Sequence, residues 1–197
     1  MTDYSRITIL NLSSKELTEL PDLSQYTNLK ELNCNDNQIT SLDNLPLGLI
    51  KLCSNYNEII SLDNLPLTLE TLYCYYNNIS SLDNLPPNLK ELYCGNNNLT
   101  SLDNLPPNLK KLYCNDNKIT RLDNLPLSLT DLICWDNQIT RLDYLPLTLE
   151  ILDCCYNQIT SLDNLPLTLT KLYCHYNSFT YNFNPTLENI RIHNQKN

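Results

Sequence analysis

A segment of the form L-x-x-L-x-C-x-x-N-x-I-T-x-L-D-N-L-P recurs every 20 residues along most of the chain. Eight copies follow one another without insertion or deletion, starting at Leu29, Leu49, Leu69, Leu89, Leu109, Leu129, Leu149 and Leu169. A looser copy begins at Ile7, and residues 187–194 match the start of a further, truncated copy. Self-similarity at a fixed short period is the signature of a solenoid, in which each repeat packs against its neighbours.

Each repeat divides into a strand and a return. In L-x-x-L-x-C alternate residues point the same way, which predicts a strand with one buried face. Strands that recur in the same direction stack as a parallel sheet, at about 4.8 Å per repeat. The return, for example SLDNLPLT, is too short for an α-helix and holds a proline, which favours an extended or polyproline-like path. The sequence therefore predicts a solenoid with a parallel sheet on its concave face, extended returns on its convex face, and little or no α-helix.

The repeats also set the expected domain organisation. Residues 1–6 form an N-terminal lead-in, residues 7–194 form a single domain of about ten turns, and residues 195–197 form a tail. The first turn shows no capping segment, so its strand is an uncovered sheet edge. Uncovered edges invite pairing with another chain. We therefore expect a weak homodimer through uncapped ends.

The repeat carries a family resemblance. L-x-x-L-x-C-x-x-N-x-I/L resembles the leucine-rich repeat signature over positions 7 to 194. The 20-residue length and the LP-x-x-L joint resemble the short repeats of bacterial type III effectors. The Cys-bearing, Asn-rich variant is similar to leucine-rich repeat proteins of giant DNA viruses (mimivirus-like) that infect amoebae. The resemblance implies a host protein as the target. Some effector relatives add a C-terminal ubiquitin-ligase domain, which we do not expect here because the sequence stops at its last repeat.

Composition excludes several classes of function. A net charge of -9 repels phosphate, so we expect neither nucleic acid nor anionic membrane as a partner. With two glycines the chain has no phosphate-cradling loop, and we expect no cofactor. The N-terminus lacks the pattern of a signal peptide, and no run of eighteen apolar residues exists. The expected location is intracellular and cytoplasmic, which is the host cytoplasm if the protein is viral.

An asparagine recurs at the ninth position of each regular repeat, where the strand bends into the return. This Asn ladder comprises Asn37, Asn57, Asn77, Asn97, Asn117, Asn137, Asn157 and Asn177. Backbone groups at a buried bend lose their sheet partners and need others. Because a side-chain amide is both donor and acceptor, we expect each asparagine to bond two neighbouring turns rather than a ligand.

A cysteine occupies the inward strand position of most repeats. This Cys ladder comprises Cys34, Cys74, Cys94, Cys114, Cys134, Cys154 and Cys174, with Ser54 in the remaining turn. Free cysteine packs as a small hydrophobe. Parallel side chains in register are poorly aimed for the disulfide dihedral, and a reducing compartment opposes oxidation. No CxxC pair points to zinc, so we predict free thiols in the core.

An aspartate recurs in the return. This Asp ladder comprises Asp43, Asp63, Asp83, Asp103, Asp123, Asp143 and Asp163. Such a side chain accepts from backbone N–H groups one or two residues further on, which would stabilise the turn. Seven carboxylates about 5 Å apart also form an acidic stripe that attracts Ca²⁺, and the sequence leaves both interpretations open.

Aromatic residues gather where the repeats differ. The return is almost copied, whereas the outward strand positions vary, and nine of the 13 tyrosines and the only tryptophan fall there. The predicted binding residues are Tyr56, Tyr73, Tyr75, Tyr76, Tyr93, Tyr113, Trp135, Tyr156, Tyr173 and Tyr176. Tyr and Trp are enriched in binding hot spots, although cross-strand stacking alone also favours aromatics here. We expect a non-catalytic protein–protein interaction module, with a structural or self-assembling component as the alternative.

One cluster offers a remote alternative. Cys155, His175 and His193 occupy the same outward column on successive repeats, so a regular last turn would align a thiol with two imidazoles. Such a group suits a transition metal or a thiolate–imidazole pair. An open sheet implies no cleft or oxyanion hole, so we expect neither a metal site nor an enzyme.

Overall fold

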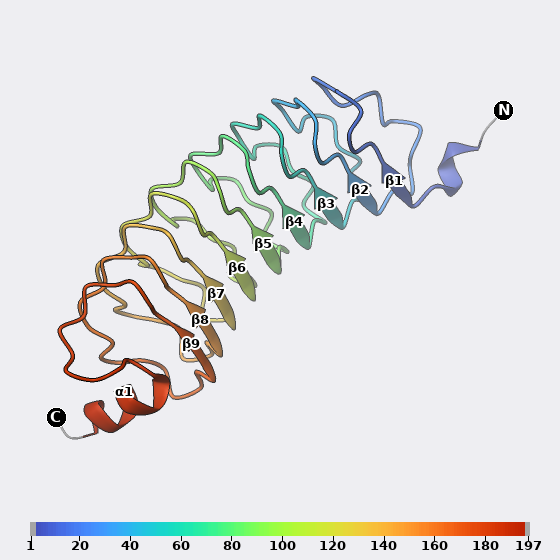
Figure 1. Cartoon of the computed structure of the whole chain (residues 1–197). Coiled ribbons are helices and arrows are strands. Elements are labelled where there is room, and N and C mark those ends of the chain that lie inside the picture. Colours follow the sequence, from blue (N-terminus) through green and yellow to red (C-terminus); the bar gives the residue numbers. More distant parts are fainter. Residues whose placement is uncertain (1–2, 196–197) are drawn as a thin grey trace.

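Nine short parallel strands stack side by side in sequence order in the computed structural model, which describes residues 3–195 (Figure 1). The strands are β1 (Ile9–Asn11), β2 (Glu31–Asn33), β3 (Lys51–Cys53), β4 (Thr71–Tyr73), β5 (Glu91–Tyr93), β6 (Lys111–Tyr113), β7 (Asp131–Ile133), β8 (Ile151–Asp153) and β9 (Lys171–Tyr173). A 3₁₀ helix η1 (Tyr4–Arg6) precedes them and one α-helix, α1 (Leu187–Asn194), follows. Residues 1–2 of the expected lead-in and 196–197 of the expected tail lie outside the described residues.

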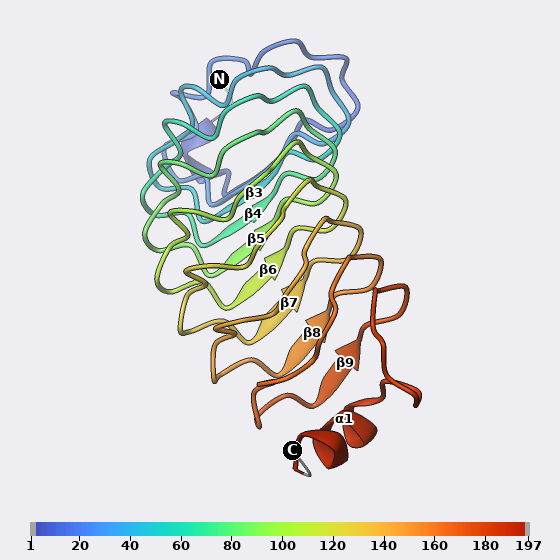
Figure 2. The ribbon, with the colours of Figure 1, turned by 90° about the vertical axis from the view of Figure 1, so that its left-hand side faces the viewer.

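The alternation of inward and outward residues fixes the register. The middle leucines of successive strands pair with one another, as Leu72 does with Leu92 and Leu92 with Leu112. In β2 to β8 this leucine is buried while the residues on either side of it are half-buried. The strands line one side of an elongated, twisted solenoid and the returns line the other (Figures 1 and 2). The predicted fold class is confirmed, with one short helix.

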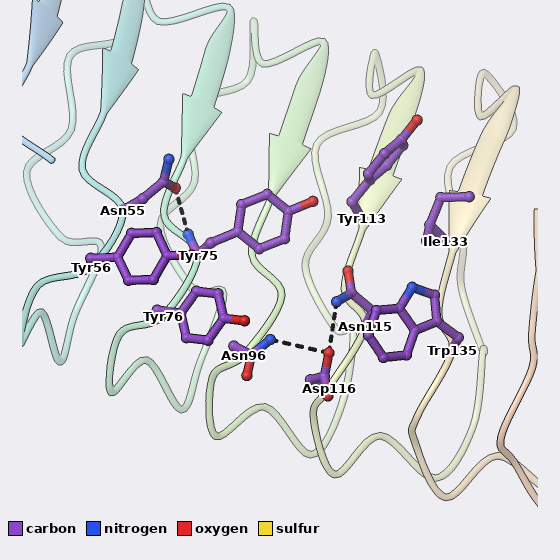
Figure 3. Close-up of a pocket in the computed structure, with 10 residues that line it drawn as sticks. All are labelled: Asn55, Tyr56, Tyr75, Tyr76, Asn96, Tyr113, Asn115, Asp116, Ile133 and Trp135. Carbon is purple, nitrogen blue, oxygen red and sulfur yellow. Dashed lines mark hydrogen bonds between the residues drawn. The ribbon is translucent and has the colours of Figure 1, made fainter. Parts of the chain in front are cut away.

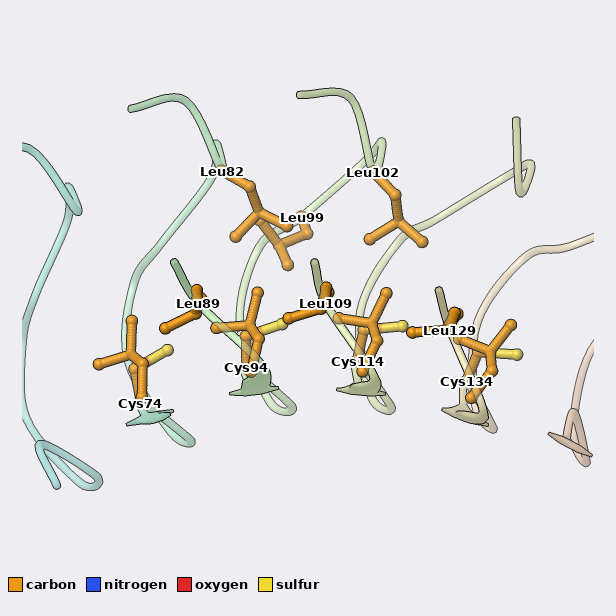
Figure 4. Packing of buried hydrophobic residues seen from close by; sticks show 14 of the residues in the cluster. Cys74, Leu82, Leu89, Cys94, Leu99, Leu102, Leu109, Cys114, Leu129 and Cys134 are labelled. Carbon is orange, nitrogen blue, oxygen red and sulfur yellow. The ribbon is translucent and has the colours of Figure 1, made fainter. Parts of the chain in front are cut away.

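The core consists of identical layers contributed by successive turns (Figure 4). The side chains of Leu89, Leu92, Cys94 and Leu99 in one turn are completely buried, and the equivalent residues of neighbouring turns repeat the arrangement. All nine cysteines are free, and the seven of the Cys ladder are buried, as predicted. Burial raises the pKa of the Cys94 thiol to about 12, so it stays protonated at neutral pH.

The Asn ladder bonds neighbouring turns, as predicted. The Asn97 amide nitrogen donates to the Cys94 carbonyl of its own turn at 3.1 Å and to the Cys74 carbonyl of the preceding turn at 3.0 Å. Its side-chain oxygen accepts the Ile79 N–H at 3.0 Å. The same pattern recurs at Asn117. Each asparagine thus satisfies backbone groups that the bend would otherwise leave unpaired inside the protein.

The Asp ladder uses partners other than the expected ones. Asp43 accepts from the Ser41 hydroxyl at 2.6 Å and from the Asn64 side-chain amide of the next turn at 3.0 Å, rather than from backbone N–H groups. Its own N–H donates to the Ser41 hydroxyl. The hydrogen bonds from Ser41 and Asn64 lower the pKa of Asp43, and Asp63 and Asp83 show the same shift. These carboxylates therefore link neighbouring returns.

The expected truncated tenth turn at residues 187–194 is wrong, because these residues form α1. Thr186 caps the helix by accepting the Asn189 N–H at 3.2 Å, and a threonine at this position favours a helix start. Ile190 is completely buried against the last turn. The Arg191 guanidinium donates to the Leu167 and Leu169 carbonyls. In the preceding turn the equivalent carbonyls accept from a threonine hydroxyl, so α1 covers the end of the solenoid by satisfying the same groups.

The N-terminal end is covered less. Tyr4 of η1 packs its ring edge-on against Tyr26 at 5.2 Å, and Asn28 donates to the Ser5 carbonyl. Strand β1 lies at the edge of the sheet, where Ile9 is 66% exposed. Within residues 3–195 no helix is long and apolar enough to span a membrane.

Candidate functional site

Three stacked tyrosines occupy the outward ends of neighbouring strands, and we call this side of the sheet the strand face. The rings of Tyr73 on β4 and Tyr93 on β5 lie nearly parallel, with centroids 4.3 Å apart. Tyr113 on β6 meets Tyr93 edge-on at 4.8 Å. The Tyr93 hydroxyl donates to Glu91 at 3.0 Å, and burial followed by this hydrogen bond raises the pKa of Tyr93. The stacking that the sequence left as an alternative is therefore present, and it makes the ring row rigid.

A glycine makes room for an aromatic ring beside this row. Gly95 lies in the column that holds Tyr75 one turn earlier and Asn115 one turn later. A β-carbon at position 95 would come within 2.5 Å of the Tyr75 ring and 2.8 Å of the Asn115 side chain. The Tyr75 ring thus lies over the Gly95 backbone, in space that any other residue would fill. Gly95 is one of only two glycines in the chain.

Four further tyrosines lie where the backbone turns left-handed. Position 56 and its equivalents have φ near +55° in every regular repeat, with Asn or Asp in four turns and tyrosine in the others. Tyr56 stacks on Tyr76 at 4.5 Å, and Tyr156 stacks on Tyr176 at 4.4 Å. A bulky side chain in this conformation costs about 1–2 kcal/mol. All four rings are exposed, so core packing does not explain their presence.

These columns enclose a pocket of about 570 Å³ on the strand face (Figure 3). We call it the strand-face pocket, and its lining residues are Asn55, Tyr56, Tyr75, Tyr76, Asn96, Tyr113, Asn115, Asp116, Ile133 and Trp135. Tyr75 and Tyr76 lie toward one end and Trp135 toward the other, with Asp116 between Tyr76 and Trp135. Aromatic walls with few polar groups are typical of ligand and hot-spot pockets.

The polar part of the pocket is held in place by hydrogen bonds. The Asn96 and Asn115 side-chain amides both donate to the same Asp116 carboxylate oxygen, at 3.1 and 2.9 Å. Asp136 occupies the equivalent position on the next turn. Burial and then the neighbouring Asp116 carboxylate raise the pKa of Asp136. The two carboxyl groups therefore repel each other when both are ionised.

Two ion pairs cross neighbouring strands of the strand face. Glu31 binds Lys51 at 3.6 Å, and Glu91 binds Lys111 at 3.0 Å, each across neighbouring strands. Lys51 also lies over the Tyr73 ring, 6.0 Å from its centroid. None of the ion pairs within residues 3–195 includes Asp116 or Asp136.

The structure brings together half of the predicted binding residues. Tyr56, Tyr75, Tyr76, Tyr113 and Trp135 line the strand-face pocket. The stacked Tyr73 and Tyr93 lie beside it, since Tyr93 is 6.2 Å from Tyr75. Tyr156, Tyr173 and Tyr176 are not among the lining residues, and they follow Trp135 along the solenoid.

Sequence reasoning missed the polar lining and the glycine. Asn96, Asn115 and Asp116 occupy the same variable columns as the tyrosines, and the interruption of an aromatic column by Gly95 was a signal that a neighbouring side chain packs against the backbone there. It also missed an exposed row of leucines on the return side: Leu47, Leu67, Leu127, Leu147 and Leu167 are 69–89% exposed.

The candidate row of Cys155, His175 and His193 does not form. His193 lies on α1, with its ring 5.4 Å from Tyr181 and 5.3 Å from Phe183. The three side chains would align only if residue 193 continued the sheet, whereas residue 193 lies on α1. Burial raises the pKa of Cys155 to about 11, which disfavours a reactive thiolate. In the described part of the chain no group of three His, Cys, Asp or Glu is arranged to hold a metal ion.

Comparison with known proteins supports the repeat assignment. The family model for leucine rich repeats (2 copies) matches residues 67–107 and 87–127. Among solved structures, YopM from Yersinia enterocolitica WA-314 aligns with a TM-score of 0.78 and 37% identity over 84% of this chain and 37% of that one. A leucine-rich repeat domain of a Shigella effector aligns with a TM-score of 0.68 and 27% identity over 89% of this chain and 72% of that one. A search of curated protein sequences found no match.

A third structure shares the Cys ladder. The functional domain of InlJ from Listeria monocytogenes, described as including a cysteine ladder, aligns with a TM-score of 0.67 and 32% identity over 90% of this chain and 46% of that one. The chain therefore spans less than half the length of the YopM and InlJ structures. The resemblance to bacterial effector repeats is confirmed, and the matched family describes a repeat rather than a catalytic domain.

Proposed function

We propose that this leucine-rich-repeat solenoid is a non-catalytic recognition module that binds a protein partner through the strand-face pocket and the tyrosines beside it. One observation carries the proposal: the variable outward positions of several turns converge on a single pocket with aromatic walls. Tyr and Trp supply large contact areas at low conformational-entropy cost. The structural neighbours include bacterial effectors.

The left-handed tyrosines support the same proposal. Asn and Asp adopt a positive φ at a lower cost. They occupy the equivalent position in four other turns, as Asp36, Asn96, Asp116 and Asp136. Exposed tyrosines at Tyr56 and Tyr76 therefore reduce stability without adding to the core. Strained backbone persists where function uses it, and here it presents two stacked rings at the pocket rim.

The experiment is site-directed crosslinking in a lysate of host cells, for which the resemblance to viral repeats suggests amoebae. A photo-reactive phenylalanine analogue replaces Tyr75 in the pocket, and in a matched control it replaces Tyr144, which is 87% exposed on the return side. We expect one protein to be crosslinked from position 75 and not from position 144. Its capture is then compared between the wild type and a variant with Tyr73, Tyr93, Tyr113 and Trp135 all changed to Ala.

Two outcomes would contradict the proposal. Crosslinking of the same protein from both positions would indicate non-specific adhesion. Undiminished capture by the quadruple variant, with its thermal melt unchanged, would place the docking surface elsewhere.

A structural, self-assembling role is the second candidate, and the open edge of β1 favours it. Ile9 is two-thirds exposed there, and within residues 3–195 β1 pairs with a strand, β2, on one side only. Edge strands pair with other chains unless blocked. Light scattering over a range of concentrations distinguishes the two roles: assembly predicts a mass that rises with concentration and falls in Ile9→Lys, whereas a recognition module stays monomeric.

A further inference from the structure

The strand-face pocket combines aromatic walls with a carboxylate that has no cationic partner among residues 3–195. Asp116 lies between the rings of Tyr76 and Trp135, and its hydrogen bonds come from the neutral amides of Asn96 and Asn115. Both amides donate to one carboxylate oxygen, which fixes the orientation of the group. A fixed carboxylate beside aromatic faces is complementary to a cation that is also planar.

Two lysines on the strand face are already paired with glutamates. Lys111 is held by Glu91 at 3.0 Å, and Lys51 is held by Glu31 at 3.6 Å. Neither is paired with Asp116 or Asp136 in the described part of the chain. The overall charge of -9 adds long-range attraction for a basic partner.

We propose that the strand-face pocket binds an arginine side chain of the partner protein, with the guanidinium stacked on the aromatic walls and hydrogen-bonded to Asp116. This inference rests on the proposed function and specifies the chemistry of the partner. Arginine suits the site better than lysine because its planar group stacks on rings and binds a carboxylate through two parallel hydrogen bonds.

The neighbouring carboxyl group strengthens the case. Asp136 follows Asp116 in the same column, and burial together with the Asp116 charge disfavours its ionised form. A guanidinium beside Asp116 offsets this repulsion, which favours the ionised form of the neighbouring carboxyl group. The pocket of about 570 Å³ has room for the residues that flank the arginine.

The test is a titration of the intact chain with capped pentapeptides of sequence Gly-Gly-X-Gly-Gly, in which X is arginine, lysine or citrulline. Citrulline has nearly the shape of arginine and no charge. The only tryptophan of the chain, Trp135, lines the pocket, so its fluorescence reports binding directly. We expect a saturable change with the arginine peptide and about tenfold weaker binding of the citrulline peptide, since charge-assisted hydrogen bonds are about twice as strong as neutral ones.

Two variants separate the pocket from the general negative charge. Asp116→Asn and Asp103→Asn each remove one charge, but Asp103 belongs to the Asp ladder on the return side. We expect arginine-peptide binding to weaken about tenfold in Asp116→Asn and less than about twofold in Asp103→Asn. The comparison of arginine with citrulline on the wild type needs no variant, so a folding defect in Asp116→Asn leaves the test intact.

Several results would overturn the inference. These are equal binding of arginine and citrulline peptides, equal or tighter binding of the lysine peptide, equal weakening by the two variants, and no saturable change with arginine. None of them affects the proposed function, because crosslinking from position 75 and capture by the quadruple variant are measured separately from peptide binding. A partner whose capture is unchanged by Asp116→Asn would show that the pocket recognises protein through its aromatic walls alone.

Discussion

The interior of the solenoid carries almost the same residue at each position in every turn, whereas the strand face changes from turn to turn. Inside, the Cys and Asn ladders repeat with a single exception, Ser54. Outside, one column runs from Tyr75 through Gly95 and Asn115 to Trp135. Interior positions face equivalent neighbours in the turns before and after them, so the same residue suits every turn. Outward positions face solvent, and the fold leaves them open to be determined by a partner.

Raising the pH is expected to have the largest effect, and it acts on the interior. Burial raises the pKa of Cys94 to about 12 and that of Cys114 well above its usual value. The unfolded chain ionises these thiols near pH 9, so above that pH the folded state binds more protons and stability falls. Each thiol contributes about 1.4 kcal/mol per pH unit over this range. Urea unfolding at pH 7, 9 and 10 measures the loss, and a midpoint that stays constant would contradict it.

Removal of one asparagine from the ladder is expected to cost about 3–5 kcal/mol, since each buried group left without a partner costs about 1–3 kcal/mol. In Asn97→Ala the carbonyls of Cys74 and Cys94 and the N–H of Ile79 lose their side-chain partner. Asn98→Ala, at the exposed next residue, serves as the control and should change stability by less than about 0.5 kcal/mol. Chemical denaturation compares the two, and similar values would remove the distinction between ladder and surface.

Replacement of a ladder cysteine by serine is expected to cost only about 1 kcal/mol, because the chain already contains this exchange. Ser54 is completely buried and donates to the Tyr73 carbonyl at 3.1 Å, as Cys34 does to the Cys53 carbonyl at 3.4 Å. Cys114→Ser keeps a donor at this position, so its hydrogen bond offsets most of the cost of burying a hydroxyl. A thermal melt measures the difference, and a loss beyond about 3 kcal/mol would show that Ser54 depends on its own turn.

The smallest expected effect is a gain in stability rather than a loss. Tyr76→Asn places a residue that tolerates positive φ at a position where φ is +54°, which offsets the loss of the stack with Tyr56. Stability should change by less than about 1 kcal/mol and rise rather than fall, while capture of the partner weakens. The conservative control Tyr76→Phe should preserve capture. A clear fall in stability with unchanged capture would assign the tyrosine a structural role.

The sequence alone determined the parallel sheet, the strand positions and the buried ladders, because a strict 20-residue period repeats the same local requirements in every turn. It also indicated which columns face outward, from the alternation within L-x-x-L-x-C. Residues 187–194 resemble the repeat, yet they form a helix that Thr186 caps and whose Ile190 packs against the last turn. Whether they form a strand or a helix depended on the residues packed against them.

Only the tertiary structure decided which outward residues meet. The pocket joins residues of separate turns, such as Tyr75, Asp116 and Trp135, and the missing β-carbon of Gly95 leaves room for the Tyr75 ring. The twist of the stack and the rotamer of each ring set these contacts, and neither follows from a one-dimensional period. The repeat therefore encodes the scaffold locally, whereas the shape and charge of the pocket arise from side chains of several successive turns, from Asn55 to Trp135.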